Sequence, residues 1–472
     1  MDILKGLQPE RVFHYFEQLS RIPHGSGNCA AISAWCASVA QSLGLECERD
    51  GVDNVIIRKP ASVGYENSPT VILQGHLDMV CEKDPTCPMN METDGLELNT
   101  DGEWIRANGT TLGGDDGIAV AMALAVLEDD TLAHPPLEVL FTTDEETGMD
   151  GAMGVDGSWL RGRRLINIDS ENEGVLTVGC AGGARADITL PVETEPCGWP
   201  CVQVRLSGLI GGHSGVEIDK GRLNASVTLG KFLHALSAEY RLVSLGGGNK
   251  DNAIPREAVC VLATQEDITA AATAFAKQNA IETDPDLTLT VTPVKTGETA
   301  LTVESSRRVA EFLASVPNGI IKMSADIEGL VQTSLNLGVL RLEDTLNASF
   351  AVRSSVGAEK TDLLNTLCDV AASFGGTCTT HSHYPAWEYR AESPMRDVMT
   401  ATYRRLYGKD MVVEIIHAGL ECGLLSEKLD GLDAVSIGPD MQDIHTARER
   451  LSVPSVARTY AYVCEVLKEL KE

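Results

Sequence analysis

The chain has 472 residues, of which 43% are hydrophobic and 22% charged, a composition typical of a soluble globular protein too long for one core. Its formal net charge of −30 argues against nucleic acid as a partner, because phosphate repels so acidic a surface. No apolar run reaches the roughly 18 residues of a membrane span, no signal peptide is evident, and thirteen scattered cysteines indicate reduced thiols in a cytoplasmic protein.

The first part of the chain alternates helices and strands. Helical periodicity covers residues 8–20 and about 29–43, and residues 53–58 resemble a strand. Residues 70–75 form a continuous apolar run rich in β-branched side chains, which is typical of a buried parallel strand. His76 closes this run and Asp78 follows two residues later. Because chemistry in open α/β sheets gathers at the carboxyl ends of strands, we interpret His76 as a metal ligand that Asp78 orients through the other ring nitrogen.

Residues 81–111 are expected to be loop-rich. A glycine-rich turn at residues 110–117 then carries Asp115 and Asp116 and opens a buried helix that runs to about residue 127. The turn lacks the lysine and the full glycine pattern of a phosphate-binding loop. Two aspartates at a helix start either cap the helix or bind a metal, and the pattern alone does not decide between these.

Acidic residues also follow the next two predicted strands. The strand at 137–143 runs into three acids at 144–146, and the strand at 165–168 ends at Asp169. Three carboxylates at the end of a buried strand repel one another unless they are exposed or a cation neutralises them. Together with His76, these acids predict a two-metal site in which one acid remains free to act as a base.

A change of pattern near residue 183 predicts a second domain. Glycine-rich residues 179–183 resemble a hinge, and the strands at 184–190 and 201–206 alternate as in a half-exposed sheet. A helix is predicted at about 220–237, and residues 323–354 are expected to form strands and turns.

The last segment returns to buried strands. They are predicted at 412–417 and 432–437, before a closing amphipathic helix at about 452–470. His445 lies in the loop after the second of these strands, and it would supply a second metal's imidazole if this segment rejoins the first domain.

The combined motifs resemble the di-zinc exopeptidase family that includes carnosinases, tripeptide aminopeptidases and aminoacylases. They are residues 75–78, 113–115, 144–148 and 169–170, with the late His445. Within that family, residues 21–26, 211–215 and 417–423 resemble the subgroup of aminoacyl-histidine dipeptidases. The resemblance covers essentially the whole chain.

The resemblance implies a metal centre and a base. One zinc would be held by His76 and Asp169 and the other by Glu146 and His445, with Asp115 bridging both. Asp78 would orient His76, and Glu145 would be the general base for a zinc-bridging hydroxide. Asp116 stays an alternative to Asp115, which we choose because it matches the glycine-glycine-acid pattern. Mn²⁺ or Co²⁺ would accept much the same ligands.

The implied fold is an α/β catalytic domain, residues 1–183 and 385–472, interrupted by an α+β lid at 184–384 built of two units of similar fold. In the lid, His213 resembles a histidine that polarises the scissile carbonyl, and Asn252 and Arg353 resemble residues that bind substrate. Gly419, in the last segment of the chain, is also expected to bind substrate. Arg353 suits a carboxylate because its guanidinium can bind one bidentately. The sequence leaves open whether His213 acts within its own chain or across a possible homodimer.

The expected activity is metal-dependent hydrolysis of dipeptides in the cytoplasm, including Xaa-His dipeptides such as β-alanyl-histidine. Hydrolysis of N-acyl amino acids and tripeptide aminopeptidase activity are the alternatives on the same scaffold. A metal-binding protein without turnover is a third possibility. The expected partner is a small peptide substrate, with neither nucleic acid nor membrane.

Overall fold

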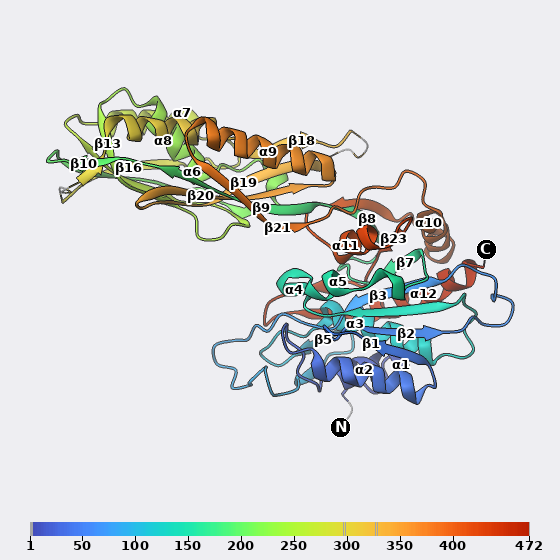
Figure 1. Ribbon diagram of the computed structural model, residues 1–472. Coiled ribbons are helices and arrows are strands. Elements are labelled where there is room, and N and C mark those ends of the chain that lie inside the picture. Colours follow the sequence, from blue (N-terminus) through green and yellow to red (C-terminus); the bar gives the residue numbers. More distant parts are fainter. Residues whose placement is uncertain (1–2, 296, 298, 326, 328, 472) are drawn as a thin grey trace. The chain divides into compact units, whose positions relative to one another are not determined.

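A computed structural model describes residues 3–295, 297, 299–325, 327 and 329–471 (Figure 1). The chain divides into two compact units. Unit 1 comprises Met1–Gly179, Tyr389–Ile415 and Leu420–Glu472, and unit 2 comprises Cys180–Glu388 and Ile416–Gly419. These boundaries lie next to the predicted ones at 183 and 385, except that residues 416–419 belong to unit 2. The roles assigned to the two units, catalytic domain and lid, stay predictions.

An eight-stranded sheet forms the centre of unit 1, in the order β1-β2-β6-β3-β7-β23-β8-β22. Its strands are β1 (Glu46–Arg49), β2 (Val55–Lys59), β3 (Val71–His76), β6 (Leu137–Thr142), β7 (Arg164–Asn167), β8 (Val175–Cys180), β22 (Val412–Ile416) and β23 (Asp433–Ser436). The neighbours β6, β3, β7 and β23 are parallel. They are buried along almost their whole length, as their continuous apolar sequences require. Their carboxyl ends therefore meet at one edge.

Helices lie on both faces of this sheet (Figure 1). They are α1 (Glu10–Leu19), α2 (Ala30–Ser42), α3 (Gly114–Glu128), α4 (Glu145–Gly148), α5 (Asp150–Gly154), α10 (Pro394–Tyr407), α11 (Glu421–Lys428) and α12 (Val453–Glu469). Helix α3 is apolar and buried on nearly all sides. At its C-terminal end the buried Lys59 Nζ donates to the carbonyl oxygens of Leu127 (2.8 Å) and Asp129 (3.0 Å), a charge that suits a helix C-terminus.

Residues 81–111, predicted to be loop-rich, also contribute two short strands to a second, four-stranded sheet in unit 1. Its order is β24-β25-β5-β4, with β4 (Leu98–Thr100), β5 (Trp104–Ala107), β24 (Met441–Gln442) and β25 (Arg450–Ser452). Strands of two to four residues are too short to show an alternating pattern. The pairing of β5 with β25 connects the segment before α3 to the segment after His445.

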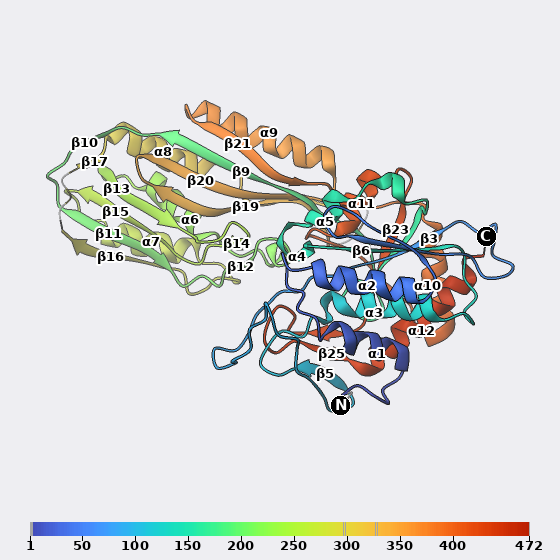
Figure 2. The ribbon, with the colours of Figure 1, turned by 60° about the horizontal axis from the view of Figure 1, so that its bottom comes forward.

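Unit 2 is an antiparallel sheet, and its helices lie along one face (Figure 1). The strand order is β16-β11-β15-β13-β19-β20-β9-β21, and β18 also pairs with β19. The strands are β9 (Gly182–Pro191), β11 (Cys201–Ser207), β13 (Tyr240–Gly247), β15 (Ala258–Thr264), β16 (Thr288–Val294), β18 (Gly319–Met323), β19 (Val331–Leu342), β20 (Thr345–Ser354) and β21 (Thr377–Tyr384). The long strands β19, β20 and β9 run side by side (Figure 2).

The helices of unit 2 are α6 (Ala225–Ala235), α7 (Thr269–Asn279), α8 (Val303–Ser315) and α9 (Gly357–Ser373). Two short pairs complete the unit: β10 (Thr194–Pro196) with β17 (Thr299–Leu301), and β12 (Gly212–His213) with β14 (Ala253–Ile254). The two α+β units expected of this region share one sheet, which is continuous where β13 pairs with β19. Residues 326 and 328 of the predicted strand-and-turn region lie outside the described residues.

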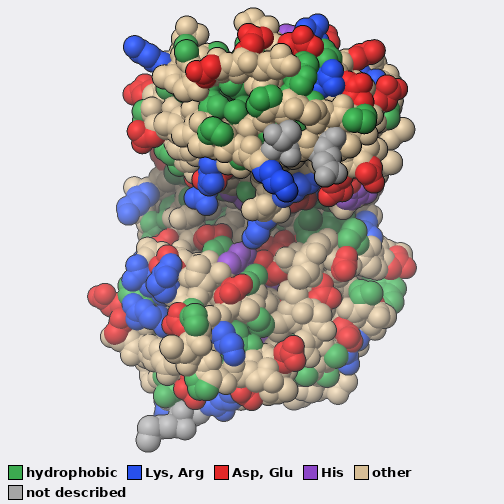
Figure 3. All heavy atoms as spheres, turned by 90° about the vertical axis from the view of Figure 1, so that its left-hand side faces the viewer, with side chains coloured by type: hydrophobic (Ala, Val, Ile, Leu, Met, Phe, Trp, Pro, Cys, Tyr) green, Lys and Arg blue, Asp and Glu red, His purple; other side chains and the backbone are tan. Residues whose placement is uncertain are grey.

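Among the described residues, no helix combines the length and the apolar character that crossing a membrane requires. Asp and Glu side chains are scattered over the face shown in Figure 3, in keeping with the net charge of −30. The thirteen cysteines, all in the described part of the chain, form no disulfide. The predicted α/β fold class is confirmed.

Candidate metal centre

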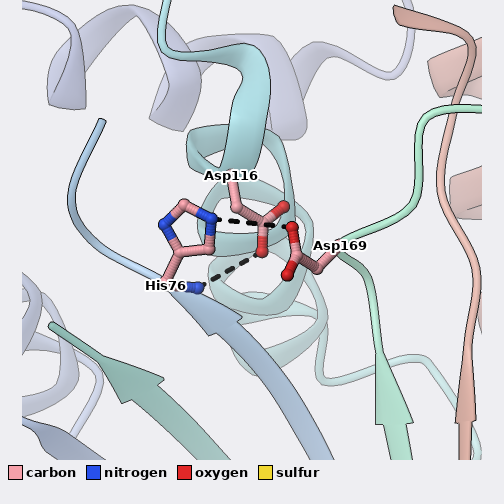
Figure 4. Close-up of side chains that lie close together, drawn as sticks. All are labelled: His76, Asp116 and Asp169. Atoms are coloured by element: carbon pink, nitrogen blue, oxygen red, sulfur yellow. Dashed lines mark hydrogen bonds and ion pairs between the residues drawn. The ribbon is translucent and has the colours of Figure 1, made fainter. Parts of the chain in front are cut away.

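The candidate site of unit 1 lies where its parallel strands end. His76 is the last residue of β3, Glu145 and Glu146 open α4 directly after β6, and Asp169 follows β7. Asp115 and Asp116 lie in the first turn of α3, and His445 lies in the loop between β24 and β25. Figure 4 shows His76, Asp116 and Asp169 close together at the start of α3. The structure thus brings together all the metal ligands proposed from the sequence.

The two ring nitrogens of His76, a side chain only 1% exposed, have different partners. Nδ1 lies 3.0 Å from the Asp78 carbonyl oxygen and 3.4 Å from its carboxylate. Nε2 lies 3.1 Å from Asp115 Oδ1 and 3.5 Å from Asp169 Oδ1. A carbonyl only accepts, so Nδ1 carries a proton and the Nε2 lone pair of the neutral ring faces the acids. Burial would lower the pKa of His76, but these acids raise it well above its ordinary value, so positive charge is favoured at Nε2.

Asp78 connects the end of β3 to the start of α4. Its carboxylate accepts hydrogen bonds from Ser26 Oγ (2.8 Å) and from the backbone N–H groups of Glu145 (3.0 Å) and Glu146 (3.2 Å). Burial would raise the pKa of Asp78, but the contacts with His76, Ser26 and the Glu145 amide outweigh it and lower that pKa to about 2. Asp78 therefore stays ionised and holds both His76 and the two glutamates. The sequence analysis assigned no role to Ser26, although Ser26 lies in the motif at residues 21–26.

His445 forms a second group with Asp115 and Glu146. Its Nε2 lies 2.8 Å from Glu146 Oε1 and 3.2 Å from Asp115 Oδ2. One ligand atom from each of the three residues lies within 4.8 Å of the others. Asp115 thus turns one oxygen to His76 and the other to His445, as a bridging carboxylate would. His445 itself has φ 56°, a left-handed conformation that costs a non-glycine residue energy and that tends to cluster at functional sites.

Asp116, the alternative bridging ligand, has a different environment. It is fully buried, and its Oδ2 accepts the backbone N–H of His76 at 3.2 Å (Figure 4). Its Oδ1 has no hydrogen-bond partner among the described residues. Asp116 can join His76 and Asp169 around one ion, but no contact connects it to His445 in the described structure. The geometry therefore supports Asp115 as the bridge.

Asp116 is buried, the other carboxylates of this site are half-buried, and all of them repel one another. Burial raises the pKa of Asp169 to about 7, helped by the charges of Asp115 and Glu421 against the opposing effect of His76. Burial and the neighbouring carboxylates also raise the pKa of Glu145 well above its ordinary value. Such a cluster is costly to ionise without positive charge beside it. Its oxygen and nitrogen atoms are the ligands that Zn²⁺, Mn²⁺ and Co²⁺ accept, so the residues fit a pair of such cations.

Glu421, to which the sequence analysis assigned no role, lies close enough to this cluster for its charge to act on Glu145 and Asp169. It is fully buried at the start of α11, and its Oε2 accepts hydrogen bonds from Gln74 Nε2 (2.6 Å) and Thr142 Oγ1 (2.7 Å). Burial raises the pKa of Glu421 to about 7. The only indication of a role for Glu421 in the sequence was its position between apolar residues in the motif at 417–423.

In unit 2, His213 is held with a defined tautomer. Its Nδ1 accepts hydrogen bonds from the backbone N–H groups of Gly215 (3.1 Å) and Val216 (3.2 Å), so the proton of the neutral ring lies on Nε2. Burial and then the charge of Arg353 lower the pKa of His213, which favours this neutral form. Asn252 lies beside it, since its carbonyl accepts the N–H of Ser214 at 2.8 Å. His213 can therefore act as a hydrogen-bond donor through Nε2.

Arg353 is 6% exposed and forms no ion pair within the described part of the chain. Its Nη1 donates to the Tyr384 hydroxyl at 2.9 Å, and a Cβ atom on Gly419 would lie 2.9 Å from that tyrosine ring. His417, 7% exposed, bonds Ser334 Oγ through Nε2 at 2.7 Å. Burial and then the charge of Arg353 lower the pKa of His417 to about 4, so it is neutral at pH 7. A buried guanidinium without a counter-ion is suited to bind an anionic ligand.

A family model and several known proteins match most of this chain. The model of Peptidase family M20/M25/M40 matches residues 72–469. The chain is 38% identical to the cytosol non-specific dipeptidase of Escherichia coli (strain K12), over 100% of this chain and 99% of that protein. The crystal structure of aminoacylhistidine dipeptidase from Vibrio alginolyticus superposes with a TM-score of 0.93 at 34% identity, covering 99% and 98% of the two chains. Aminopeptidase PepT from Bacillus cereus ATCC 10987, at 15% identity and a TM-score of 0.59 over 99% and 100%, shares the fold.

Because the carboxylate cluster is costly without cations, removing divalent metal should destabilise the protein. A ligand present at 100 times its Kd stabilises the folded state by about 2.7 kcal/mol. We expect EDTA to lower the Tm of metal-loaded protein by several degrees, and Zn²⁺, Mn²⁺ or Co²⁺ to restore it, as measured by calorimetry. The double variant E146Q/H445A should lose part of this response. A Tm that no divalent ion changes would contradict the presence of a metal centre.

Proposed function

The chain belongs to peptidase family M20/M25/M40, and on that premise we propose that it is a metal-dependent dipeptidase of broad range that also cleaves Xaa-His dipeptides such as β-alanyl-histidine. The observation that carries the proposal is the Asp115 carboxylate, which faces His76 with one oxygen and His445 with the other. The dipeptidase from Escherichia coli supports the substrate class, and its name supports a cytoplasmic location.

We assign the cation ligands as the sequence suggested. His76 and Asp169 would hold one zinc ion, Glu146 and His445 would hold the other, and Asp115 would contribute to both; Mn²⁺ or Co²⁺ would serve with the same ligands. When bound, such ions act as Lewis acids that polarise a peptide carbonyl and lower the pKa of water toward neutrality. Asp78 keeps the His76 ring oriented for this task through Nδ1.

Glu145 is the residue we assign as the general base. Its backbone is fixed by Asp78, and its carboxyl belongs to the acidic cluster around His76. Because burial and neighbouring carboxylates raise its pKa, its carboxylate accepts a proton more readily than that of a free glutamate. It would take a proton from the attacking water and pass that proton to the leaving amine.

Substrate recognition is assigned to unit 2. Arg353 supplies a buried positive charge for the free carboxylate at the C-terminus of a dipeptide, and Tyr384, Asn252 and Gly419 belong to the same set of substrate contacts. His213, with its proton on Nε2, would donate to the carbonyl oxygen as negative charge develops there. A requirement for a free carboxylate at the C-terminus of the substrate distinguishes a dipeptidase from enzymes that accept substrates with a blocked C-terminus.

The variant E145Q tests the assignment of the base. It should keep both metal ions, because Glu145 is not among the assigned ligands, whereas kcat for dipeptide hydrolysis should fall by about 10²- to 10⁴-fold. Metal content is measured by atomic emission and kcat by ninhydrin detection of released amino acid. The matched control is E427Q, an exposed glutamate of α11, which should match the wild type. Wild-type turnover by E145Q would remove Glu145 from the mechanism.

The variant R353M tests recognition of the carboxylate. A hydrogen bond to a charged group contributes about 1.5–3 kcal/mol, so KM for a dipeptide should rise roughly 10- to 100-fold. The preference for a dipeptide over its C-terminal amide, measured as a ratio of kcat/KM values, should shrink by the same factor. R205M, which removes an exposed arginine paired with Glu257 in unit 2, is the control. An unchanged preference in R353M would place the carboxylate site elsewhere.

A further inference from the structure

Glu449 is a buried carboxylate four positions after His445, and it is only 3% exposed. Four consecutive backbone N–H groups donate to it. Oε2 accepts those of Leu112 (2.7 Å) and Gly113 (3.2 Å), and Oε1 accepts those of Gly114 (2.8 Å) and Asp115 (3.4 Å). Both oxygens are therefore committed to the turn that opens α3.

This turn is shaped around the Glu449 carboxylate. Gly113 has φ 67°, a left-handed conformation that a glycine adopts without steric cost. A Cβ atom at Gly114 would lie 3.2 Å from Glu449 Oε1, so the absence of a side chain lets the carboxylate approach the backbone. Free N–H groups at a helix start attract an anion, and here the anion is a side chain of the protein itself. The turn ends at Asp115, the assigned bridging ligand.

Glu449 is equally well fixed on the side of His445. Its N–H donates to the Thr446 carbonyl at 3.1 Å, and Thr446 Oγ1 donates to the Asp443 carbonyl at 2.7 Å. Strand β25 begins at the next residue and pairs with β5. One side chain thus joins the loop of His445 to the turn of Asp115, although the two ligands lie 330 positions apart.

We propose that Glu449 is a positioning residue of the metal centre, which fixes the Asp115 backbone so that its carboxylate can face both cation positions. Glu449 acts through Asp115 and His445, because its own oxygens are occupied by amide N–H groups. The inference rests on the proposed function, since it presumes that a pair of cations binds at this site. Cation affinity therefore depends on a residue that is not itself a ligand.

A second buried glutamate of unit 1 serves as a control, because it distinguishes positioning of the metal centre from general stabilisation of the fold. Glu138 is 2% exposed, and it accepts the N–H groups of Arg161 (2.9 and 3.1 Å) and Gly162 (2.9 Å). It lies near the start of β6, whereas Glu145 follows the other end of that strand. Glu138 therefore shares the burial and the backbone contacts of Glu449, but within the described part of the chain none of its side-chain hydrogen bonds reaches the turn of Asp115 or the loop of His445.

The test compares the wild type with E449Q, E449D and E138Q. In E449Q an NH₂ group replaces one oxygen and faces amide donors, so part of the turn loses its acceptor. We expect affinity for the more weakly bound cation, titrated with Co²⁺ or Zn²⁺, to fall about 10- to 100-fold in E449Q. The visible absorption of the Co²⁺ protein should change with it, and kcat should fall while KM stays within about twofold. E138Q should keep wild-type affinity and spectrum even if its Tm falls.

Two results would overturn the inference: E449Q with wild-type cation affinity and spectrum, or E138Q with the same loss as E449Q. If E449Q does not fold, E449D decides by the same readouts, because it keeps the charge but is one methylene too short to reach all four amides. A wild-type protein that binds no pair of cations would refute the proposed function itself. A wild type with two cations and an unaffected E449Q would refute only the role of Glu449.

Discussion

Repulsion among buried carboxylates is the constraint on which unit 1 depends. Asp115, Asp116, Glu145, Glu146 and Asp169 gather around His76 and His445, in positions where water cannot fully solvate them. Ionised carboxylates in such a place raise one another's pKa and disfavour the folded state unless positive charge compensates. Protons can supply that charge on the two imidazoles, and divalent cations can supply more of it. The arrangement that would destabilise a structural core is thus suited to bind two metal ions.

Backbone amides hold the side chains of this site in place. The Asp78 carboxylate accepts the N–H groups of Glu145 and Glu146, and the Asp116 carboxylate accepts that of His76. Glu449 accepts the four N–H groups that lead to Asp115. Each acid thereby fixes the backbone of a neighbouring functional residue, so these contacts hold the backbone at His76, Glu145, Glu146 and Asp115. Such mutual support is what a site needs if its geometry is to be set before substrate arrives.

The sequence predicts the parts of this site that are local. Continuous apolar runs identified β3, β6 and β7, and they pointed to His76, to the acids at 144–146 and to Asp169 as candidate ligands, because these residues lie at or just after the ends of the strands. The family resemblance then added the roles of Asp115 and His445, which stay predictions supported by the geometry.

The missed features depend on long-range contacts. Strands β4, β5, β24 and β25 contain two to four residues each, so no periodicity could show them. Glu449 and Glu421 look like ordinary acids in the sequence. Their roles arise from partners more than 270 positions away, as for Glu449 with Leu112 and Glu421 with Thr142. The assignment of residues 416–419 to unit 2 likewise follows from contacts that composition does not reveal.

The most direct test of the account is the release of histidine from β-alanyl-histidine by the full-length protein. It is measured with zinc-loaded protein, after EDTA treatment, and after zinc is added back. We expect release that EDTA abolishes and zinc restores. Absence of release from this and other dipeptides by protein that holds two zinc ions, or release that EDTA does not affect, would contradict it.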